Sequence, residues 1–286
     1  MSKEITVSRQ GELLEYLIEA MPNLSRKKVK ELLEHKSIII NGKIVTQFNY
    51  RLLKGQKITV DRQNKYSLLS KHNITIIHED DELIIINKPY GLLSVANDDA
   101  GKPTVFSVIS DYVKISNPQN RVYIVHRLDR DTSGVLMLSK NEGLKIKLQD
   151  NWNALVKKRL YYAVCEGVFE KKQDSVTTYL EEDKNNVVFT TQDPTAQKAV
   201  TDYKVIKEGG GYSLLDISIK TGKKNQIRVC MKSLGHPAAG DKKYGSGKSI
   251  IKRLALHAYL ISFVHPVTDE LITFNTDMPK DFNKFF

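Results

Sequence analysis

The nine residues HRLDRDTSG (126–134) decide how the rest of the sequence is best interpreted. An apolar run at residues 122–125 ends where they begin, and a second apolar run at residues 135–138 starts where they end. Short apolar runs on both sides predict two strands joined by a loop. Such a loop would hold Asp129 between two arginines and present it to an anionic substrate.

The chemistry of this loop depends on the state of its carboxylate. Asp129 lies between Arg127 and Arg130, and nearby cations favour the ionised form of a carboxylate and lower its pKa. An ionised aspartate can be a nucleophile, a general base or a metal ligand, and Asp131 alone is weak support for a metal. In most proteins this pattern is a surface salt-bridge cluster. Two features favour a functional loop here. They are the flanking apolar runs and the tight re-entry at Ser133-Gly134, where the chain passes from the loop back into a strand.

Composition bounds the class of protein. The chain has 286 residues, 41% of them hydrophobic, which allows one large or two modest domains with a proper core. Its formal net charge is +11 and its pI is about 9.4. A lysine-rich solvated surface would give this charge, but a basic excess of this size favours a polyanionic partner, RNA or DNA before a membrane.

Signals for targeting and for cysteine chemistry are weak. Residues 1–5 lack the apolar core of a signal peptide, and the apolar stretches at 38–40 and 83–86 are far too short to span a bilayer. Cys165 and Cys230 form no close-spaced pair, which argues against a disulfide scaffold, a redox motif and a thiolate zinc site. We expect a cytoplasmic protein without a membrane segment.

The N-terminal part predicts a small helical and β module. Residues 9–21 carry apolar side chains at helical spacing, and Ser25 is a suitable N-cap for a second helix over residues 26–35. Short apolar runs on both sides of Asn41-Gly42 predict a β-hairpin, because this dipeptide is the strongest short-range hairpin signal. Residues 57–60 predict a last strand.

The second helix carries a basic cluster, made of Arg26, Lys27, Lys28 and Lys30. On an isolated helix such a cluster is more often a solvated face than a binding site. The run SRKKVKELLEHKSIIINGKIV (25–45), however, resembles the S4 RNA-binding domain. This resemblance covers about residues 9–61. It implies that residues 1–61 form an S4-like α/β module that binds structured RNA through backbone contacts, with the basic cluster as part of its surface. Residues 62–72 are polar and would form a linker.

Strand-like segments dominate from residue 74 onward. An acidic turn at Asp80-Asp81 predicts a hairpin, and a helical pattern covers residues 141–158 with Asn141 as its cap. Further strands are expected at 160–166, 201–205, 212–219, 254–263 and 271–275. Many connections are too short for crossover helices, so the sheet should be largely antiparallel. We predict an α+β domain over residues 73–286, built on a mostly antiparallel mixed sheet.

The nine residues belong to a longer resemblance. The segment HRLDRDTSGVLMLSK (126–140) is similar to the signature of the RluA-type RNA pseudouridine synthases. Further family motifs follow in order along residues 73–286: NKPYGLL (87–93), LYYAVCEG (160–167), TGKKNQIRV (221–229), GHP (235–237) with GD (240–241) and YG (244–245), and LALHA (254–258). Several motifs in one order are far more specific than an isolated HRLD. The resemblance implies the pseudouridine synthase fold and the conversion of uridine in RNA to pseudouridine.

The same resemblance implies a role for each central residue. Asp129 would act on the target uridine, either as a nucleophile or by assisting glycosidic cleavage in another way, and Arg228 would pair with it and keep it ionised. Tyr161 would stack on the target base and accept or donate a proton at C5. Tyr162 faces the other side of the strand, so a one-residue register error would exchange the two. Arg127 would fill the gap left by the extruded uridine.

Four more residues are expected to contact substrate, namely Lys88, Arg130, Lys224 and Asn225. In Lys223-Lys224-Asn225 the chain departs from the Arg-Thr-His usual in the family. Lysine keeps the charge of arginine but loses its planar fork, so substrate contacts at this loop should differ from those of relatives. The resemblance implies neither a metal nor a cofactor.

The RNA target stays open at this point. Large-subunit (23S) rRNA is the expected target, because S4-bearing relatives often modify it, and tRNA is the alternative. A non-catalytic S4-type RNA-binding or ribosome-assembly protein would also explain the charge, although Asp129, Tyr161 and Arg228 argue against it. We expect a monomer, because no apolar stripe is left unassigned.

Overall fold

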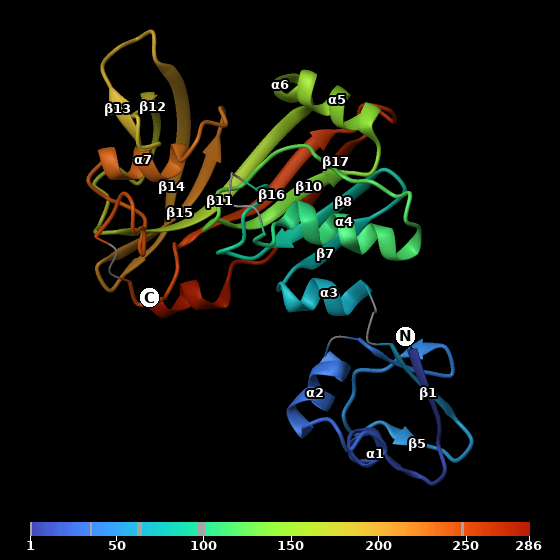
Figure 1. The fold of residues 1–286 in the computed structure, drawn as a ribbon. Coiled ribbons are helices and arrows are strands. Elements are labelled where there is room, and N and C mark those ends of the chain that lie inside the picture. The colour runs from blue at the N-terminus through green and yellow to red at the C-terminus, as the bar shows by residue number, and fades with distance from the viewer. Residues whose placement is uncertain (1, 35, 62–64, 97–100, 247–248) are drawn as a thin grey trace. The chain divides into compact units, whose positions relative to one another are not determined.

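The computed structural model describes residues 2–34, 36–61, 65–96, 101–246 and 249–286. Contacts divide the chain into two units, whose elements are drawn in Figure 1. The small unit contains residues 1–74 and 108–120, and the large unit contains residues 75–107 and 121–286.

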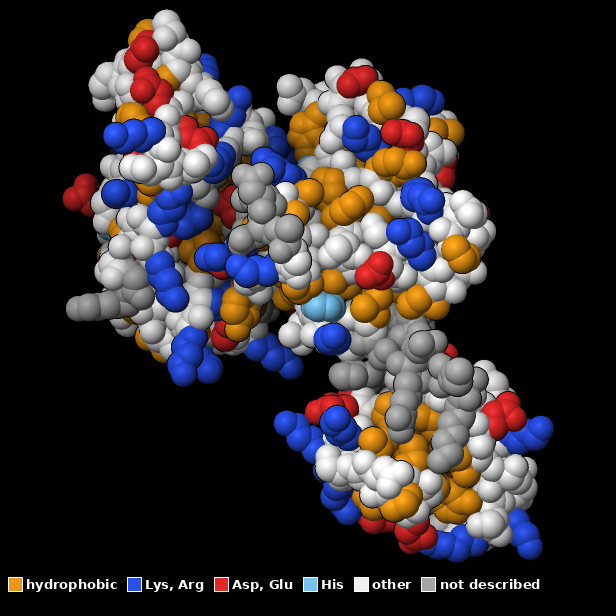
Figure 2. All heavy atoms as spheres, in the orientation of Figure 1, with side chains coloured by type: hydrophobic (Ala, Val, Ile, Leu, Met, Phe, Trp, Pro, Cys, Tyr) orange, Lys and Arg blue, Asp and Glu red, His pale blue; other side chains and the backbone are white. Residues whose placement is uncertain are grey.

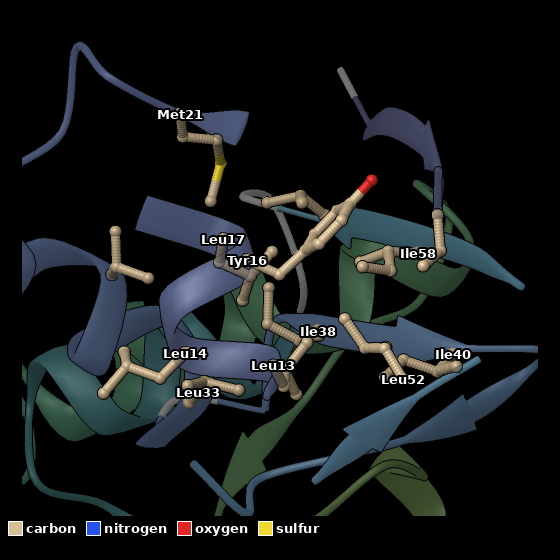
Figure 3. Packing of buried hydrophobic residues seen from close by; sticks show 13 residues of the cluster. Leu13, Leu14, Tyr16, Leu17, Met21, Leu33, Ile38, Ile40, Leu52 and Ile58 are labelled. Carbon is tan, nitrogen blue, oxygen red and sulfur yellow. The ribbon is translucent and has the colours of Figure 1, made fainter. Parts of the chain in front are cut away.

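The small unit packs two helices against a sheet. The helices are α1 (Leu13–Ala20) and α2 (Arg26–Glu34), and the described strands of the sheet run in the order β1 (Ser2–Thr6), β6 (Lys57–Asp61), β3 (Ile38–Ile40) and β4 (Lys43–Ile44). A short pair, β2 (Gly11–Glu12) with β5 (Arg51–Leu52), leads directly into α1. Helix and sheet side chains share one core (Figure 3), which includes the fully buried Leu13, Leu17, Leu33, Ile38 and Ile58.

Local sequence signals account for most of these elements. Asn41 and Gly42 have φ values of 48° and 81°, the geometry of the type I′ turn that joins β3 to β4. Ser25 caps α2, since its Oγ accepts a hydrogen bond from the Lys28 N–H at 3.3 Å. α1 starts later than predicted, at Leu13, because the two residues before it pair with β5. His35, the predicted end of α2, lies outside the described residues.

The segment predicted as a linker is partly helical. Residues 62–64 lie outside the described residues, and α3 (Lys65–Lys71) follows them with Leu69 buried. A helix this short contains too few turns for an apolar period to be recognised in its sequence. The linker at 62–72 and the domain limits 1–61 and 73–286 stay predictions.

The large unit is built on a mostly antiparallel sheet, as predicted. Its described strands run in the order β13 (Val188–Thr191), β12 (Gln173–Glu182), β14 (Gln197–Gly209), β15 (Tyr212–Ile219), β11 (Val156–Glu166), β16 (Leu256–Val264), β10 (Ser133–Ser139), β8 (Leu83–Lys88) and β7 (Thr75–Glu79). In addition, β17 (Leu271–Asn275) pairs with β16, and β9 (Tyr123–Ile124) pairs with β10. Between described strands, only β10 and β16 pair in parallel, which makes the sheet mixed.

The helices of the sequence beyond residue 100 differ from the prediction in extent. They are α4 (Val105–Ser116), α5 (Glu142–Asp150), α6 (Trp152–Leu155), α7 (Gln226–Ser233) and the 3-10 helix η1 (Lys280–Phe285). Asn141 caps α5 as predicted, accepting from the Leu144 N–H at 3.1 Å. The predicted helix over 141–158 is too long, because Val156 pairs with Phe263 and starts β11. α4 and α7 were not predicted. Among the described residues, no helix combines the length and apolarity that crossing a membrane requires.

Gly134 allows the parallel pair to form. It has φ +120°, and a Cβ atom at this position would lie 2.0 Å from the carbonyl oxygen of Ala258. Ser133 pairs with His257 and Gly134 with Ala258, so the backbones of β10 and β16 approach too closely for any other residue. The re-entry at Ser133-Gly134 therefore has a steric cause, and it fixes the end of the 126–134 loop.

Candidate active site

The 126–134 loop lies between β9 and β10, where the sequence predicted it. Ser94 holds it from one side, since its Oγ donates to the carbonyl of Leu128 (2.7 Å) and accepts from the N–H of the same residue (3.1 Å). The Gly91 N–H donates to the carbonyl of Arg130 at 2.8 Å. The backbone on both sides of Asp129 is thus fixed by hydrogen bonds.

Lys88, which was predicted to contact substrate, is buried and bonded to the backbone. Its side chain is inaccessible, and its Nζ donates to the carbonyls of Pro89 (2.9 Å), Leu92 (2.7 Å) and Arg130 (3.0 Å). Desolvation lowers the pKa of Lys88 to about 7, although two nearby aspartates act in the opposite direction. All three ammonium protons have acceptors, so Lys88 ties the turn after β8 to the 126–134 loop.

Asp129 and Arg228 meet in the folded chain. The Asp129 side chain is 33% exposed, and its Oδ2 lies 3.8 Å from Nη1 of Arg228. This separation is that of an ion pair without a direct hydrogen bond. The carboxylate is therefore accessible on one side and faces a guanidinium on another.

The surroundings raise the pKa of Asp129, whereas the sequence predicted that neighbouring arginines would lower it. Desolvation is the largest cause, and the charges of Arg228 and Lys88 offset only part of it. Arg130 does not help, because its Nε and Nη2 donate to the carboxylate of Asp131, both at 3.1 Å. The cations that favour ionisation of Asp129 therefore come from distant parts of the chain.

Arg228 is held mainly by Asp241, to which the sequence had assigned no role. Nε and Nη2 of Arg228 donate to Oδ2 and Oδ1 of Asp241 at 2.7 and 2.8 Å, and the carboxylate is fully buried. Desolvation opposes ionisation of Asp241, but its bonds with Arg228 and with two backbone N–H groups outweigh this and lower its pKa. Arg228 is thus near Asp129 as predicted, but Asp129 is its second, weaker carboxylate partner.

Asn225, which was predicted to contact substrate, is buried and supports Arg228. It adopts a left-handed conformation (φ 53°) just before α7. Its Oδ1 accepts from Nη1 of Arg228 at 2.8 Å, and its Nδ2 donates to the hydroxyl of Tyr244 at 3.1 Å. The Tyr244 ring lies 4.9 Å from the Arg228 guanidinium, and its hydroxyl also accepts from the Val188 N–H. A continuous network thus joins β13 to Arg228.

Tyr161 lies on β11, on the side of the sheet that packs with α7. Desolvation raises its pKa to about 12, with the charge of Asp129 adding to the effect and that of Arg159 opposing it. Tyr162 points to the other face, where its ring stacks on Tyr259 at 4.0 Å and 13°. The register therefore brings Tyr161, and not Tyr162, into electrostatic range of Asp129.

Arg127 is exposed beside the buried Leu128. Among the residues that the structure describes, none forms a hydrogen bond or an ion pair with its guanidinium. This differs from Arg130 and Arg228, whose guanidinium groups are occupied by carboxylates. The Arg127 side chain is therefore exposed to solvent on the 126–134 loop.

Besides Arg130, two more of the predicted RNA contacts are engaged with protein carboxylates. Nζ of Lys224 pairs with Glu182 at the end of β12, although the side chain stays partly exposed. Arg26 pairs with Glu15 of α1 at 2.8 Å. The remaining basic residues of α2 are exposed, namely Lys27, Lys28 and Lys30.

The structure adds two residues that the sequence reasoning missed. Asp241 and Tyr244 belong to the GD and YG motifs, but these motifs do not indicate which side chain either residue contacts. Their partner Arg228 lies on a helix that was not predicted, so the pairing could not be inferred from spacing. The informative feature is the burial of Asp241, and burial cannot be inferred from the sequence of a polar loop.

A comparison with known protein families identifies the chain. The family model described as RNA pseudouridylate synthase matches residues 82–233, which include the 126–134 loop, Tyr161 and Arg228. The chain belongs to this family. As a pseudouridine synthase it is an enzyme that converts uridine in RNA to pseudouridine, so the alternative of a non-catalytic RNA-binding protein is wrong.

Relatives of this pseudouridine synthase match along nearly its whole length. An uncharacterized RNA pseudouridine synthase of Bacillus subtilis is 31% identical, over 97% of this chain and 93% of its own. The ribosomal large subunit pseudouridine synthase D of Haemophilus ducreyi is 30% identical, over 99% of this chain and 94% of its own. The solved structure of human RNA pseudouridylate synthase domain containing 4 has the same fold, with a TM-score of 0.63 at 22% identity, covering 77% of this chain and 94% of that one.

Proposed function

We propose that this pseudouridine synthase modifies a uridine of large-subunit ribosomal RNA, with Asp129 as its catalytic carboxylate. Relatives from Haemophilus ducreyi and Haemophilus influenzae are named ribosomal large subunit pseudouridine synthase D, which supports rRNA over tRNA. The net charge of +11 favours a polyanionic substrate. Figure 2 supports this further, because Lys and Arg side chains are spread over the visible face of the half of the large unit that carries α7, β14 and β15.

One observation carries the role of Asp129: an accessible carboxylate, 33% exposed, faces an arginine that is itself immobilised by a buried partner. Burial raises the pKa of Asp129, which makes its ionised form a better base and nucleophile, and Arg228 and Lys88 favour that ionised form. Such a pair suits a reaction in which an anionic carboxylate acts on the nucleoside while a fixed cation holds that carboxylate in position.

The reaction is an isomerisation: uridine and pseudouridine contain the same atoms, so no second reactant is needed. The bond between N1 of uracil and C1′ of ribose breaks, the freed uracil turns, and a bond forms between C5 and C1′. The proton leaves C5, and N1 gains one. Asp129 acts in the first of these steps, either by direct attack or by assisting departure of the base.

Tyr161 is suited to hold the base rather than to remove a proton from it. With a pKa of about 12, its phenol is neutral in the free enzyme at neutral pH and is a poor general base. A neutral ring within electrostatic range of Asp129 offers a stacking surface for uracil and a hydroxyl that can donate. We therefore assign stacking and hydrogen-bond donation to Tyr161.

Arg127 is proposed to fill the space that the target uridine leaves in the RNA stack. Extrusion of a base costs a few kcal/mol, and a planar guanidinium can stack in its place. The exposed position of Arg127 on the 126–134 loop, close in sequence to Asp129, supports this role. Arg130, in contrast, is paired with Asp131, so it would add positive charge to the site rather than insert into the RNA stack.

Residues 1–61 are proposed to be an S4-like RNA-docking module. The helix–hairpin order and the Asn41-Gly42 turn agree with that pattern, and Lys27, Lys28 and Lys30 present three exposed cations on α2. Contacts from such lysines to phosphates would add affinity and orient the RNA without reading its sequence.

Release of tritium from [5-³H]uridine-labelled RNA tests the activity directly, because the C5 proton is lost in the reaction. Purified enzyme should release tritium from protein-free large-subunit rRNA and not from tRNA. Pseudouridine mapping in a strain that lacks the gene should then show a missing modification in that rRNA. Release from tRNA alone, with an unchanged rRNA map, would replace rRNA by tRNA as the substrate.

A further inference from the structure

Tyr90 is a half-exposed aromatic residue next to the 126–134 loop. It lies in the turn after β8, and 50% of the residue is accessible. One face of its ring is covered by the guanidinium of Arg253, whose central carbon lies 4.5 Å from the ring centroid. Tyr90 is therefore half-exposed even though Arg253 covers one face of its ring.

Arg253 is a fixed support for this ring. Its Nε donates to the carbonyl of Leu254 (3.0 Å), and its Nη2 donates to the carbonyl of Leu256 (3.3 Å) and to Oγ of Ser133. Its guanidinium also lies 5.4 Å from the ring of Phe282. An arginine held in this way keeps the tyrosine ring in one orientation, so little side-chain entropy is left to lose on binding.

The backbone of Tyr90 is fixed as well. Lys88 donates to the carbonyl of Pro89, the residue just before Tyr90, and to that of Leu92. The Gly91 N–H, just after it, donates to the carbonyl of Arg130, the residue that follows Asp129. Tyr90 is thus one residue from a direct backbone link to the catalytic loop, and these hydrogen bonds fix its backbone relative to that loop.

A rigid aromatic surface with a cation behind it is suited to bind a nucleobase. Bases stack on aromatic side chains whatever their identity, because every base has a π-face. Extrusion of the target uridine leaves its neighbours in the RNA strand with one stacking partner fewer. We propose that Tyr90 stacks on an unpaired base adjacent to the extruded uridine and so forms a second nucleotide subsite. This inference rests on the proposed function of Asp129.

The test is a double-mutant cycle between protein and RNA. Wild type, Tyr90→Phe and Tyr90→Ala are assayed on a synthetic RNA that spans the mapped target uridine, and on copies with an abasic site at each flanking position in turn. Tyr90→Ala should lower kcat/KM roughly 5- to 150-fold, the range given by the loss of one stacked base, while kcat at saturating RNA is nearly unchanged. Tyr90→Phe should behave like wild type. Leu271→Ala, an exposed position on β17, is the matched control and should have no effect.

The abasic copies separate stacking from a merely structural role. At one flanking position, the abasic RNA should react equally slowly with wild type and Tyr90→Ala, because the contact is already absent. If Tyr90→Ala has the same relative effect on every copy, or if Tyr90→Phe is as slow as Tyr90→Ala, the subsite is refuted while the proposed function stands. If wild type forms no pseudouridine in any RNA, the proposed function fails, and this inference fails with it.

Discussion

Substitution of Asp241 tests how the active site sets the properties of Asp129. Asp241→Asn keeps the shape of the side chain but removes its charge and turns an N–H group toward the Arg228 guanidinium. The pair is fully buried on the Asp241 side, with two hydrogen bonds of 2.7 and 2.8 Å. Breaking a buried pair by removing one partner costs about 3–5 kcal/mol. For a domain of this size we expect a fall in Tm of roughly 10 °C.

The same substitution should change the pH dependence of the reaction. Asp241 raises the pKa of Asp129 through its charge and also occupies Arg228. Without it, Arg228 is left with Asp129, 3.8 Å away, as its carboxylate partner. Both effects lower the pKa of Asp129, so this carboxylate stays ionised to lower pH. The acid limb of kcat/KM, which reports the free enzyme, should therefore move to lower pH while the maximal rate falls.

Tritium release measured between pH 4 and pH 8, together with thermal melts, checks both expectations. Asp131→Asn is the matched control, because Asp131 also raises the pKa of Asp129 but is 39% exposed and paired with an exposed Arg130. It should move the acid limb in the same direction with little change in Tm, since exposed pairs contribute about 0–1 kcal/mol. An acid limb that stays in place or moves to higher pH in Asp241→Asn would refute this account of Asp129.

Two further variants test the buried lysine and the small unit. The pKa of Lys88 is about 7 in the folded protein, below its ordinary value of 10.5, so between these pH values the unfolded chain binds one more proton than the folded chain. The free energy of unfolding should therefore rise from pH 7 to pH 9 by about 1.4 kcal/mol per pH unit. Denaturant melts of Lys88→Met should lack this rise, and an equal pH dependence of the unfolding free energy in the two proteins would contradict it. The combined change of Lys27, Lys28 and Lys30 to Gln should lower the slope of log Kd against log salt by about 1 for each phosphate contact removed, with kcat unchanged. Arg26→Gln should change the salt slope less, because Arg26 is already paired with Glu15. An unchanged salt slope in the triple variant would refute the RNA-docking role.

The sequence predicted the features that depend on local patterns. The strands on both sides of 126–134, the Asn41-Gly42 turn and the Asn141 cap each follow from a few adjacent residues, and all are confirmed. Strand alternation separated Tyr161 from Tyr162 for the same reason. Gly134 in the re-entry is required by contact with β16.

Features that depend on tertiary contacts could not be predicted in this way. The helix pattern from Leu144 continued past Trp152, but pairing of Val156 with β16 ended it. α7 contains β-branched residues that favour strands, and its start depends on the left-handed Asn225. The burial of Lys88 and the pairing of Arg228 with Asp241 arise only when distant segments meet. Neither could be inferred from the residues that adjoin Lys88 or Arg228 in the sequence.

The most direct test of the central claim is Asp129→Asn, assayed for tritium release and for RNA affinity in parallel. The substitution keeps the size of the side chain and removes its charge, one-third exposed, beside Arg228. We expect no detectable release above background from large-subunit rRNA and a Kd for the same RNA close to that of wild type, because binding is carried by cations elsewhere. Release at or near the wild-type rate would contradict the assignment of Asp129 as the catalytic carboxylate.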